Sequence, residues 1–443
     1  MVSRPSKRSR VLRLEKAPRQ HPAALTQPKG ERILRDQQKI DKGKGRERVV
    51  SSPQAADRPS FPLAFKIVAG SYEKLLYGLE ASSSVEGLSY KFSLKPVFIF
   101  PAHLSSVRAI AASPQGGKWL ATGSGDEIIK VWDLRRRKEI GGLMQHEGSI
   151  THLEFPSRSH LLSASEDGTI CLFHARDWAV LRVLKGHKGR VNSLAVHPSG
   201  KVALSVGKDK TLRMWDLMRG KGSASTKLGK EAEVVRWSID GSLFVVLSQS
   251  TMDIYSIDMT LLHSITHPSR LHDVRFCRRV VGNGEVLLVA AEDKKVSVYD
   301  VSSDKTVIPN IIAEMIGHTN RVKAVEVLSV SLPTAYTIRS WTTLVSTISS
   351  DGRVRLYDMA SVPVSTEGKI QLDAIAEYDT KGSRLTCLTM ADGEVVDDAN
   401  INGKRKRDDE DSDVDENALE EEILDEQNGG AVNSSCDDSE DEE

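Results

Sequence analysis

A short pattern that recurs along the middle of the chain constrains the fold more than any other feature of the sequence. In each copy an Asp precedes an aromatic residue by six positions, and apolar residues alternate with polar ones between them. Such alternation is typical of a half-buried β-strand, and an Asp before it favours a tight turn. Five copies share the pattern, from Asp126 to Trp132, Asp167 to Phe173, Asp209 to Trp215, Asp293 to Tyr299 and Asp351 to Tyr357.

Two degenerate copies complete the series. They end at Tyr77 and Tyr255 and lack the Asp. Consecutive aromatics of the seven copies are 40 to 58 residues apart, and four of the six spacings lie between 40 and 44. A repeat of about 40–45 residues is typical of one four-stranded blade of a β-propeller. The sequence therefore predicts an all-β fold with seven blades.

A second regularity accompanies the repeat. A His stands upstream of each of the five Asp residues, and a Ser or Thr precedes four of them by four positions. The two copies without Asp lack the upstream His and carry apolar Ile67 and Val245 at the hydroxyl position. Partners that disappear together are expected to form one buried hydrogen-bonded set, because an unpaired buried member costs about 1–3 kcal/mol. The predicted structural sets are His103, Thr122, Asp126 and Trp132; His146, Ser163 and Asp167; His187, Ser205, Asp209 and Trp215; His267 and Asp293; and His318, Thr347 and Asp351.

The repeat resembles that of the WD40 family, whose blades carry a Gly-His and a Trp-Asp signature. Gly186-His187 and Gly317-His318 match the first dipeptide, and Trp132-Asp133 and Trp215-Asp216 match the second. The ends of the repeat region also complement each other. Residues 384–390 read as an innermost strand with no blade of its own, whereas the first blade begins at Phe65 without an innermost strand. Joining the two is expected to close the ring and to leave only short, protected edges.

The two ends of the chain differ from the repeat region in charge. Residues 1–60 carry 16 Lys and Arg against 6 acidic residues, and residues 408–443 carry 18 acidic residues and no basic one. Such polar segments cannot bury enough apolar surface to fold. We therefore expect a disordered basic arm over 1–60, the propeller over 61–391, and a disordered tail over 392–443 that ends in the acidic run.

The tail contains one compact basic cluster in front of the acidic run, consisting of Lys404, Arg405, Lys406 and Arg407. A basic cluster in a disordered context is typical of a nuclear localisation signal, which predicts a nuclear protein. The alternative is that the cluster only offers counter-charge to the adjacent acids.

Composition and motifs exclude several classes of function. The four cysteines lie far apart, which argues against a disulfide framework and against a zinc site. No apolar run approaches the ~18 residues of a membrane helix. The His, Asp and hydroxyl residues resemble a hydrolase triad in type, but a catalytic triad occurs once, whereas this set recurs in five blades. We expect no enzyme activity, no cofactor, no metal, no membrane segment and no small-molecule substrate.

The loops around the predicted sets offer a surface for partners. In a four-stranded blade the His loop and the Asp turn share one face, so the residues one and three after each His, and the one before each Asp, point onto it. Five of these residues are basic, and three of the five lie in a single blade. The alternative to a binding surface is that they are solvated charges without a partner. The candidates for binding RNA or protein are Lys188, Arg190, Lys208, Arg270 and Arg321.

Several stretches, among them 68–78, 166–171, 185–191, 197–213 and 384–388, together resemble the p21-activated kinase-interacting protein 1-like family of nucleolar WD40 proteins. The resemblance implies a non-enzymatic scaffold of large ribosomal subunit assembly whose partners are proteins of the pre-60S particle and pre-rRNA. It also implies an alternative, negative regulation of p21-activated kinase through direct binding of the kinase regulatory region. A third class, a propeller-fold enzyme, would need a polar or metal-lined central channel, which the sequence does not support.

Overall fold

A computed structural model describes residues 61–393, except 88, 303, 334, 335, 337 and 363–367. The expected arm over 1–60 and the segment from 394 to 443, including the Lys404–Arg407 cluster, lie outside the described residues. Within the described part the chain forms β-strands and one short 3₁₀ helix, η1 (Met359–Ser361). No helix in this part is long and apolar enough to cross a membrane.

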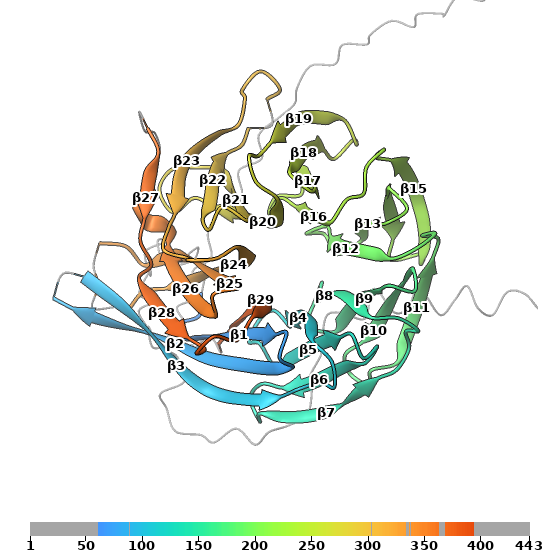
Figure 1. Cartoon of the computed structure of the whole chain (residues 1–443), viewed down its shortest axis with the longest axis horizontal. Helices are drawn as coiled ribbons and strands as arrows, with labels where there is room; N and C mark the ends of the chain where they lie inside the picture. Colours follow the sequence, from blue (N-terminus) through green and yellow to red (C-terminus); the bar gives the residue numbers. More distant parts are fainter. Residues whose placement is uncertain are drawn as a thin grey trace, which may run out of the picture. The chain divides into compact units, whose positions relative to one another are not determined.

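The strands assemble into seven sheets arranged in a ring, as Figure 1 shows. We call these sheets blades 1 to 7, and blades 2 to 5 each use four consecutive strands, given from the innermost to the outermost. Blade 2 holds β4 (Val107–Ala112), β5 (Trp119–Ser124), β6 (Ile129–Asp133) and β7 (Lys138–Leu143); blade 3 holds β8 (Ile150–Glu154), β9 (His160–Ser165), β10 (Thr169–His174) and β11 (Val180–Lys185); blade 4 holds β12 (Val191–Val196), β13 (Val202–Gly207), β14 (Thr211–Asp216) and β15 (Lys221–Lys227); and blade 5 holds β16 (Val234–Trp237), β17 (Leu243–Ser248), β18 (Thr251–Ser256) and β19 (Leu261–Thr266).

The remaining three blades take strands from more than one part of the chain. Blade 1 holds β29 (Leu385–Asp392), β1 (Phe65–Ser71), β2 (Leu75–Glu86) and β3 (Ser89–Pro101); blade 6 holds β20 (Leu271–Arg278), β21 (Glu285–Ala291), β22 (Val296–Asp300), β23 (Asn310–Met315) and β27 (Ile370–Leu372); and blade 7 holds β24 (Val322–Ser331), β25 (Trp341–Ser349), β26 (Arg353–Asp358) and β28 (Ala376–Asp379). The predicted seven-bladed propeller is confirmed.

Burial follows the position of a strand within its blade. Every residue of the second strand of blade 5, Leu243–Ser248, is buried, and its sequence is apolar except for the final Ser. Every residue of the outermost strand of blade 4, Lys221–Lys227, is exposed, and its sequence is polar and small. The apolar clusters form between the faces of neighbouring blades, so each blade supplies side chains to two clusters. Because successive side chains point to opposite faces and both faces of an inner strand are buried, such a strand is apolar along its whole length.

The ring closes as the sequence predicts. β29 lies beside β1 in antiparallel register, with Ile67 opposite Met390 and Ala69 opposite Leu388 (Figure 1). The hydroxyl of Tyr77 lies 2.6 Å from that of Ser383, which precedes β29. The innermost strand of blade 1 therefore comes from the end of the repeat region, and β1 is paired on both sides.

Two long hairpins meet at the junction of blades 7 and 1. Beyond Ala81, β2 and β3 pair only with each other, and the ring of Tyr90 on this ribbon contacts Tyr336, with the ring centroids 4.8 Å apart. Tyr336 lies in the segment that joins the extended strands β24 and β25. The hydroxyl of Tyr90 also donates to Asp358. The lengthened hairpin of blade 7 thus packs against the ribbon of blade 1.

Blade 6 has a fifth strand that the sequence does not predict. After β26 and η1 the chain crosses to the neighbouring blade, where β27 pairs in parallel with β23. It then returns as β28, the outermost strand of blade 7. Lys295 and Lys369 both contact the carboxylate of Glu314 on β23, at 2.8 and 3.5 Å. The crossing therefore ties the outer strands of blades 6 and 7 together.

Candidate functional site

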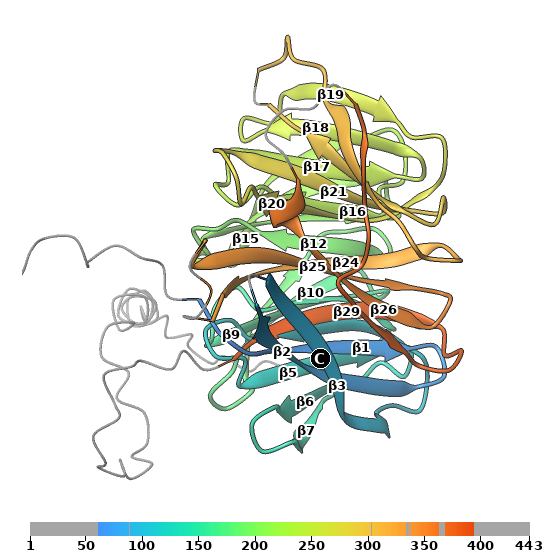
Figure 2. The same cartoon turned by 90° about the vertical axis from the view of Figure 1, so that its left-hand side faces the viewer.

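The turns between strands lie on two opposite faces of the ring, as the side view shows (Figure 2). We call the histidine face the side formed by the loops that enter the blades at His103, His146, His187, His267 and His318. The turns between the second and third strands, which carry the Asp residues, lie on the same side. The turns after the first and third strands form the opposite face.

In blade 4 the predicted set is assembled around His187. Its Nδ1 lies 3.0 Å from Oδ2 of Asp209, and its Nε2 lies 2.7 Å from the hydroxyl of Ser205. The indole N–H of Trp215 donates to the same hydroxyl at 2.7 Å. Asp209 also accepts the backbone N–H of Lys188 at 3.0 Å. One carboxylate therefore holds the imidazole and fixes the entering loop against the Asp turn.

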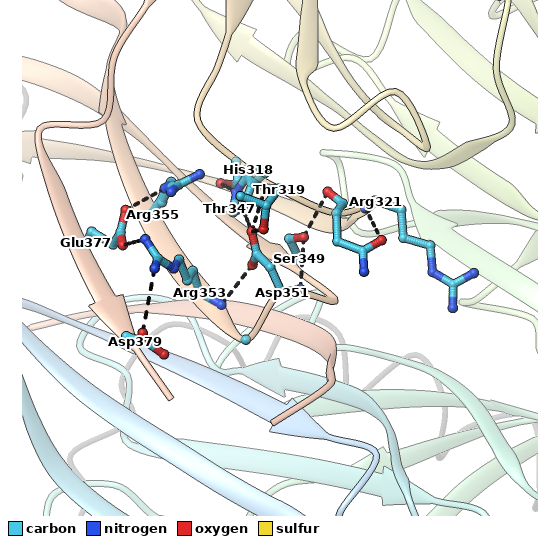
Figure 3. Close-up of polar contacts among 12 residues, drawn as sticks. His318, Thr319, Arg321, Thr347, Ser349, Asp351, Arg353, Arg355, Glu377 and Asp379 are labelled. Carbon is cyan, nitrogen blue, oxygen red and sulfur yellow. Dashed lines mark hydrogen bonds and ion pairs between the residues drawn. The ribbon is translucent and has the colours of Figure 1, made fainter. Parts of the chain in front are cut away.

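Three other blades repeat this geometry. The distance from histidine Nδ1 to the Asp carboxylate is 3.0 Å for His103, 2.9 Å for His146 and 3.1 Å for His318, and the Nε2 to hydroxyl distance is 2.8, 2.6 and 2.8 Å. Figure 3 shows the His318 set, in which Asp351 lies between the imidazole and the start of β26. The aromatic position differs among these blades. Trp132 donates its indole N–H to Thr122 at 2.9 Å, Phe173 has no donor, and the Tyr357 hydroxyl donates to the Ile316 carbonyl at 2.7 Å.

Blade 6 departs from the pattern, which corrects the expected set of His267 and Asp293. Nδ1 of His267 accepts from Ser269, two residues on, and Nε2 stays 3.8 Å from Asp293. One carboxylate oxygen of Asp293 is buried without a hydrogen-bond partner among the described residues. The hydroxyl position of this blade is Val289, which cannot accept from an imidazole. Without that acceptor the ring bonds within its own loop.

The four complete sets are buried, and each Asp also fixes the backbone N–H that follows its His. Both ring nitrogens of each His are occupied, and the side chain of His187 is buried. Burial lowers the pKa of His187, against the opposing effect of Asp209, so the imidazole is neutral near pH 7. Burial alone would raise the pKa of Asp209, but the N–H of Lys188 and the hydroxyl of Thr211 lower it below its usual value. Among the described residues no group of His, Cys, Asp and Glu could hold a metal ion.

The five basic candidates lie on the histidine face, but their charges are not equally available. Arg190 contacts Glu231 at 3.2 Å, and Arg270 contacts Glu233 at 2.8 Å. Arg321 donates to the hydroxyl of Ser350 at 3.3 Å. Lys188 and Lys208 are exposed, and their ammonium groups make no ion pair with any described acidic residue. Only a tertiary structure could separate the neutralised cations from the free ones, because Glu231 and Glu233 precede blade 5, which neighbours the blades of Arg190 and Arg270.

The structure also brings together charged residues that sequence reasoning missed. The innermost strands of blades 5, 6 and 7 carry Arg236, paired with Asp273 at 3.4 Å, and Arg275, paired with Glu326 at 2.6 Å. Burial raises the pKa of Glu326, and the facing Arg275 opposes this effect. A recess of about 390 Å³ lies beside these pairs. In the sequence, these residues could have been recognised as charged residues within the otherwise apolar stretches that form the innermost strands.

Known proteins resemble this chain over the same region. The profile of the family described as "WD domain, G-beta repeat" matches residues 94–133, 137–174 and 178–216. A Danio rerio protein named "p21-activated protein kinase-interacting protein 1-like" is 36% identical over 73% of this chain and 80% of its own length. The Saccharomyces cerevisiae protein named "Protein MAK11" is 32% identical over 79% of this chain and 88% of its own length. The Schizosaccharomyces pombe protein named "Shk1 kinase-binding protein 15" is 30% identical over 73% of this chain and 83% of its own length.

The difference between blades 4 and 6 provides a matched test of the histidine sets. Asp209→Ala removes the acceptor of a buried imidazole and of a loop N–H, so we expect it to lower the free energy of unfolding by about 2–3 kcal/mol. Asp293→Ala removes a carboxylate that makes no close bond to its His, and we expect it to cost less than about 1 kcal/mol. Urea unfolding followed by circular dichroism measures both. Equal losses in the two variants would contradict the assigned role of Asp209.

Proposed function

Because the chain belongs to the p21-activated protein kinase-interacting protein 1-like family of WD40 proteins, we propose that it is a non-enzymatic scaffold in large (60S) ribosomal subunit biogenesis. Its partners in this role are proteins of the pre-60S particle and pre-rRNA, and its site of action is the nucleolus. The sequence resemblance implies this role, and the use of the His and Asp residues in fixing loops supports a scaffold over an enzyme.

The observation that carries the RNA part of the proposal is the charge of blade 4. From residue 185 to residue 230 the sequence has eleven Lys and Arg and only two acidic residues, Asp209 and Asp216. Asp209 is engaged by His187, and Asp216 accepts from the backbone of Arg219. The cations of this blade therefore outnumber their local counter-charges. RNA phosphates attract such a surface by releasing bound counterions, which makes the binding sensitive to salt.

The first test of the proposed role is depletion of the protein from growing cells. We expect free 60S subunits and 80S ribosomes to fall in sucrose gradients while 40S subunits persist, and pre-rRNA to co-purify with the tagged chain. A gradient with an unchanged 60S peak after full depletion would reject the assembly role.

The names of two relatives favour a second candidate, regulation of a p21-activated kinase through direct binding of its regulatory region. The two roles separate under RNase treatment. A purified kinase regulatory domain captured by the RNase-treated protein would support kinase binding. Loss of all partners after RNase, with no capture of the kinase domain, would support the ribosomal role alone.

The free cations of the histidine face supply a sharper prediction. We expect the double variant Lys188→Glu and Lys208→Glu to co-sediment with pre-60S particles several-fold less than the native chain at moderate salt. Its melting temperature should stay unchanged, because both side chains are exposed. The matched control is Lys294→Glu with Lys381→Glu, which makes the same change of charge on exposed residues of blade 6 and of the loop before β29. Equal loss in both variants would show that net charge alone matters.

We also propose that Lys404, Arg405, Lys406 and Arg407 direct nuclear import. Changing all four to Ala, in a chain that lacks the basic residues 1–60, should move a fluorescent fusion from the nucleus to the cytoplasm. The control is the same shortened chain with the cluster intact, which should remain nuclear. A nuclear signal from both chains would refute the assignment.

A further inference from the structure

The opposite face of blades 2, 3 and 4 is built by pairs of turns that hydrogen-bond to each other. The turn after the third strand donates a backbone N–H to the turn after the first strand, at 2.9 Å in blade 2, 2.6 Å in blade 3 and 2.9 Å in blade 4. The two turns of each blade therefore form one surface. The N–H groups of Leu134, Ala175 and Leu217 donate to the carbonyls of Lys118, Ser159 and Lys201, respectively.

These paired turns carry exposed cations that no described acidic residue neutralises. Blade 2 supplies Arg137, blade 3 supplies Arg158 and Arg176, and blade 4 supplies Lys201 and Lys221. None of the five forms an ion pair with a described residue, in contrast to Arg190 and Arg270 on the histidine face.

The charge of this face changes sign at the next blade. In blade 5 the equivalent turns are joined by the same type of backbone bond, from Ile257 to Ser242 at 2.9 Å. They carry Asp240 and Asp258 instead of cations. The cationic surface of blades 2 to 4 therefore ends at blade 5, and the shared turn geometry does not require it.

Two indole rings lie within this surface at the junction of blades 2 and 3. Trp119 begins β5, Trp178 lies in the turn before β11, and their ring centroids are 5.6 Å apart with an interplanar angle of 85°. Both side chains are partly exposed, and the ammonium of Lys118 lies 4.5 Å from the centroid of the Trp119 ring. Aromatic faces beside cations are the usual platform on which proteins stack unpaired bases.

The surface continues from blade 3 to blade 4. The aliphatic part of Arg182 on β11 packs against Gly220 in the turn before β15, and a Cβ at this glycine would lie 2.7 Å from the Arg182 side chain. Gly220 has a φ of +64°, so a glycine serves both the turn and the close approach. The Arg182 side chain of blade 3 therefore contacts the cationic turn of blade 4.

We propose that this face, defined by Arg137, Arg158, Arg176, Lys201 and Lys221 with Trp119 and Trp178, binds single-stranded RNA. The cations contact phosphates, and the indoles stack against bases. Single strands fit better than a duplex, because a duplex hides its base faces. The inference names a binding surface for the pre-rRNA of the proposed function, but binding of RNA by the purified protein tests it independently.

The experiment measures fluorescence anisotropy of a labelled 20-nucleotide single-stranded RNA with the purified full chain. The triple variant Arg158→Glu, Arg176→Glu and Lys201→Glu should bind at least about tenfold more weakly at 100 mM salt. The salt dependence of log Kobs should become shallower by about 2, at ~0.7 per lost phosphate contact. The matched control, Lys74→Glu with Lys294→Glu and Lys381→Glu, changes the charge equally on exposed residues of the histidine face to which no contact is assigned, and it should lose less.

A second set of variants separates lost binding from lost folding. The glutamine versions of the same three residues keep the side chains polar and uncharged, and they should weaken binding by an intermediate factor with an unchanged melting temperature. RNA should also quench the tryptophan fluorescence, and Trp178→Ala should reduce that quenching.

Three outcomes would overturn the proposal. The first is equal binding by the native chain and the triple variant, and the second is a larger loss in the histidine-face control. The third is saturable binding of a glutamate-rich peptide, but not of RNA, which would identify an acidic protein as the partner. RNA binding that depends on this face, together with normal 60S levels after depletion, would support the surface and reject the ribosomal role.

Discussion

The fold depends on one carboxylate in each of four blades, which fastens two loops at once. Oδ2 of the Asp receives the histidine ring and the backbone N–H of the following residue, and Oδ1 receives the N–H at the start of the third strand, at 3.1 Å in blade 4. Because the His arrives on the loop from the preceding blade, the same bonds set the position of one blade relative to the next. In each of these blades a backbone bond between the two loops adds to this hold, such as the Lys208 N–H to the Arg190 carbonyl at 2.9 Å. An apolar replacement at any member would leave the others buried without partners.

The three blades without a complete set rely on other contacts. Ile67, Val245 and Val289 occupy the hydroxyl position and are fully buried, so apolar packing replaces the hydrogen bond. Blade 1 gains pairing with β29 and with the ribbon that contacts blade 7, and blade 6 gains the parallel strand β27. Near the centre, the paired charges of Arg236 and Arg275 occupy innermost strands where apolar residues would otherwise meet. Buried charges of this kind are tolerated because each forms an ion pair with a residue of opposite charge.

The two faces of the propeller present different chemistry. On the histidine face several arginines pair with glutamates of a neighbouring blade, so part of the positive charge is neutralised in place. On the opposite face Arg136 and Arg219 pair with aspartates of their own turns, whereas the five cations named above form no ion pair with a described residue. A folded scaffold can in this way present two chemically different surfaces to its partners. Since such surface charges contribute little to stability, they are free to serve binding.

The sequence by itself determined the fold class, the number of blades, the ring closure and four of the five histidine sets. Each of these rests on a pattern that repeats, and repetition places His187, Asp209 and Ser205 together without knowledge of the packing. Only the tertiary structure decided that His267 turns to its own loop, that β27 joins a neighbouring blade, and which cations remain unpaired. These depend on residues far apart in sequence, such as Arg270 and Glu233, whose meeting no local pattern encodes. Periodicity is local, whereas the pairing of surface charges depends on which residues of neighbouring blades meet.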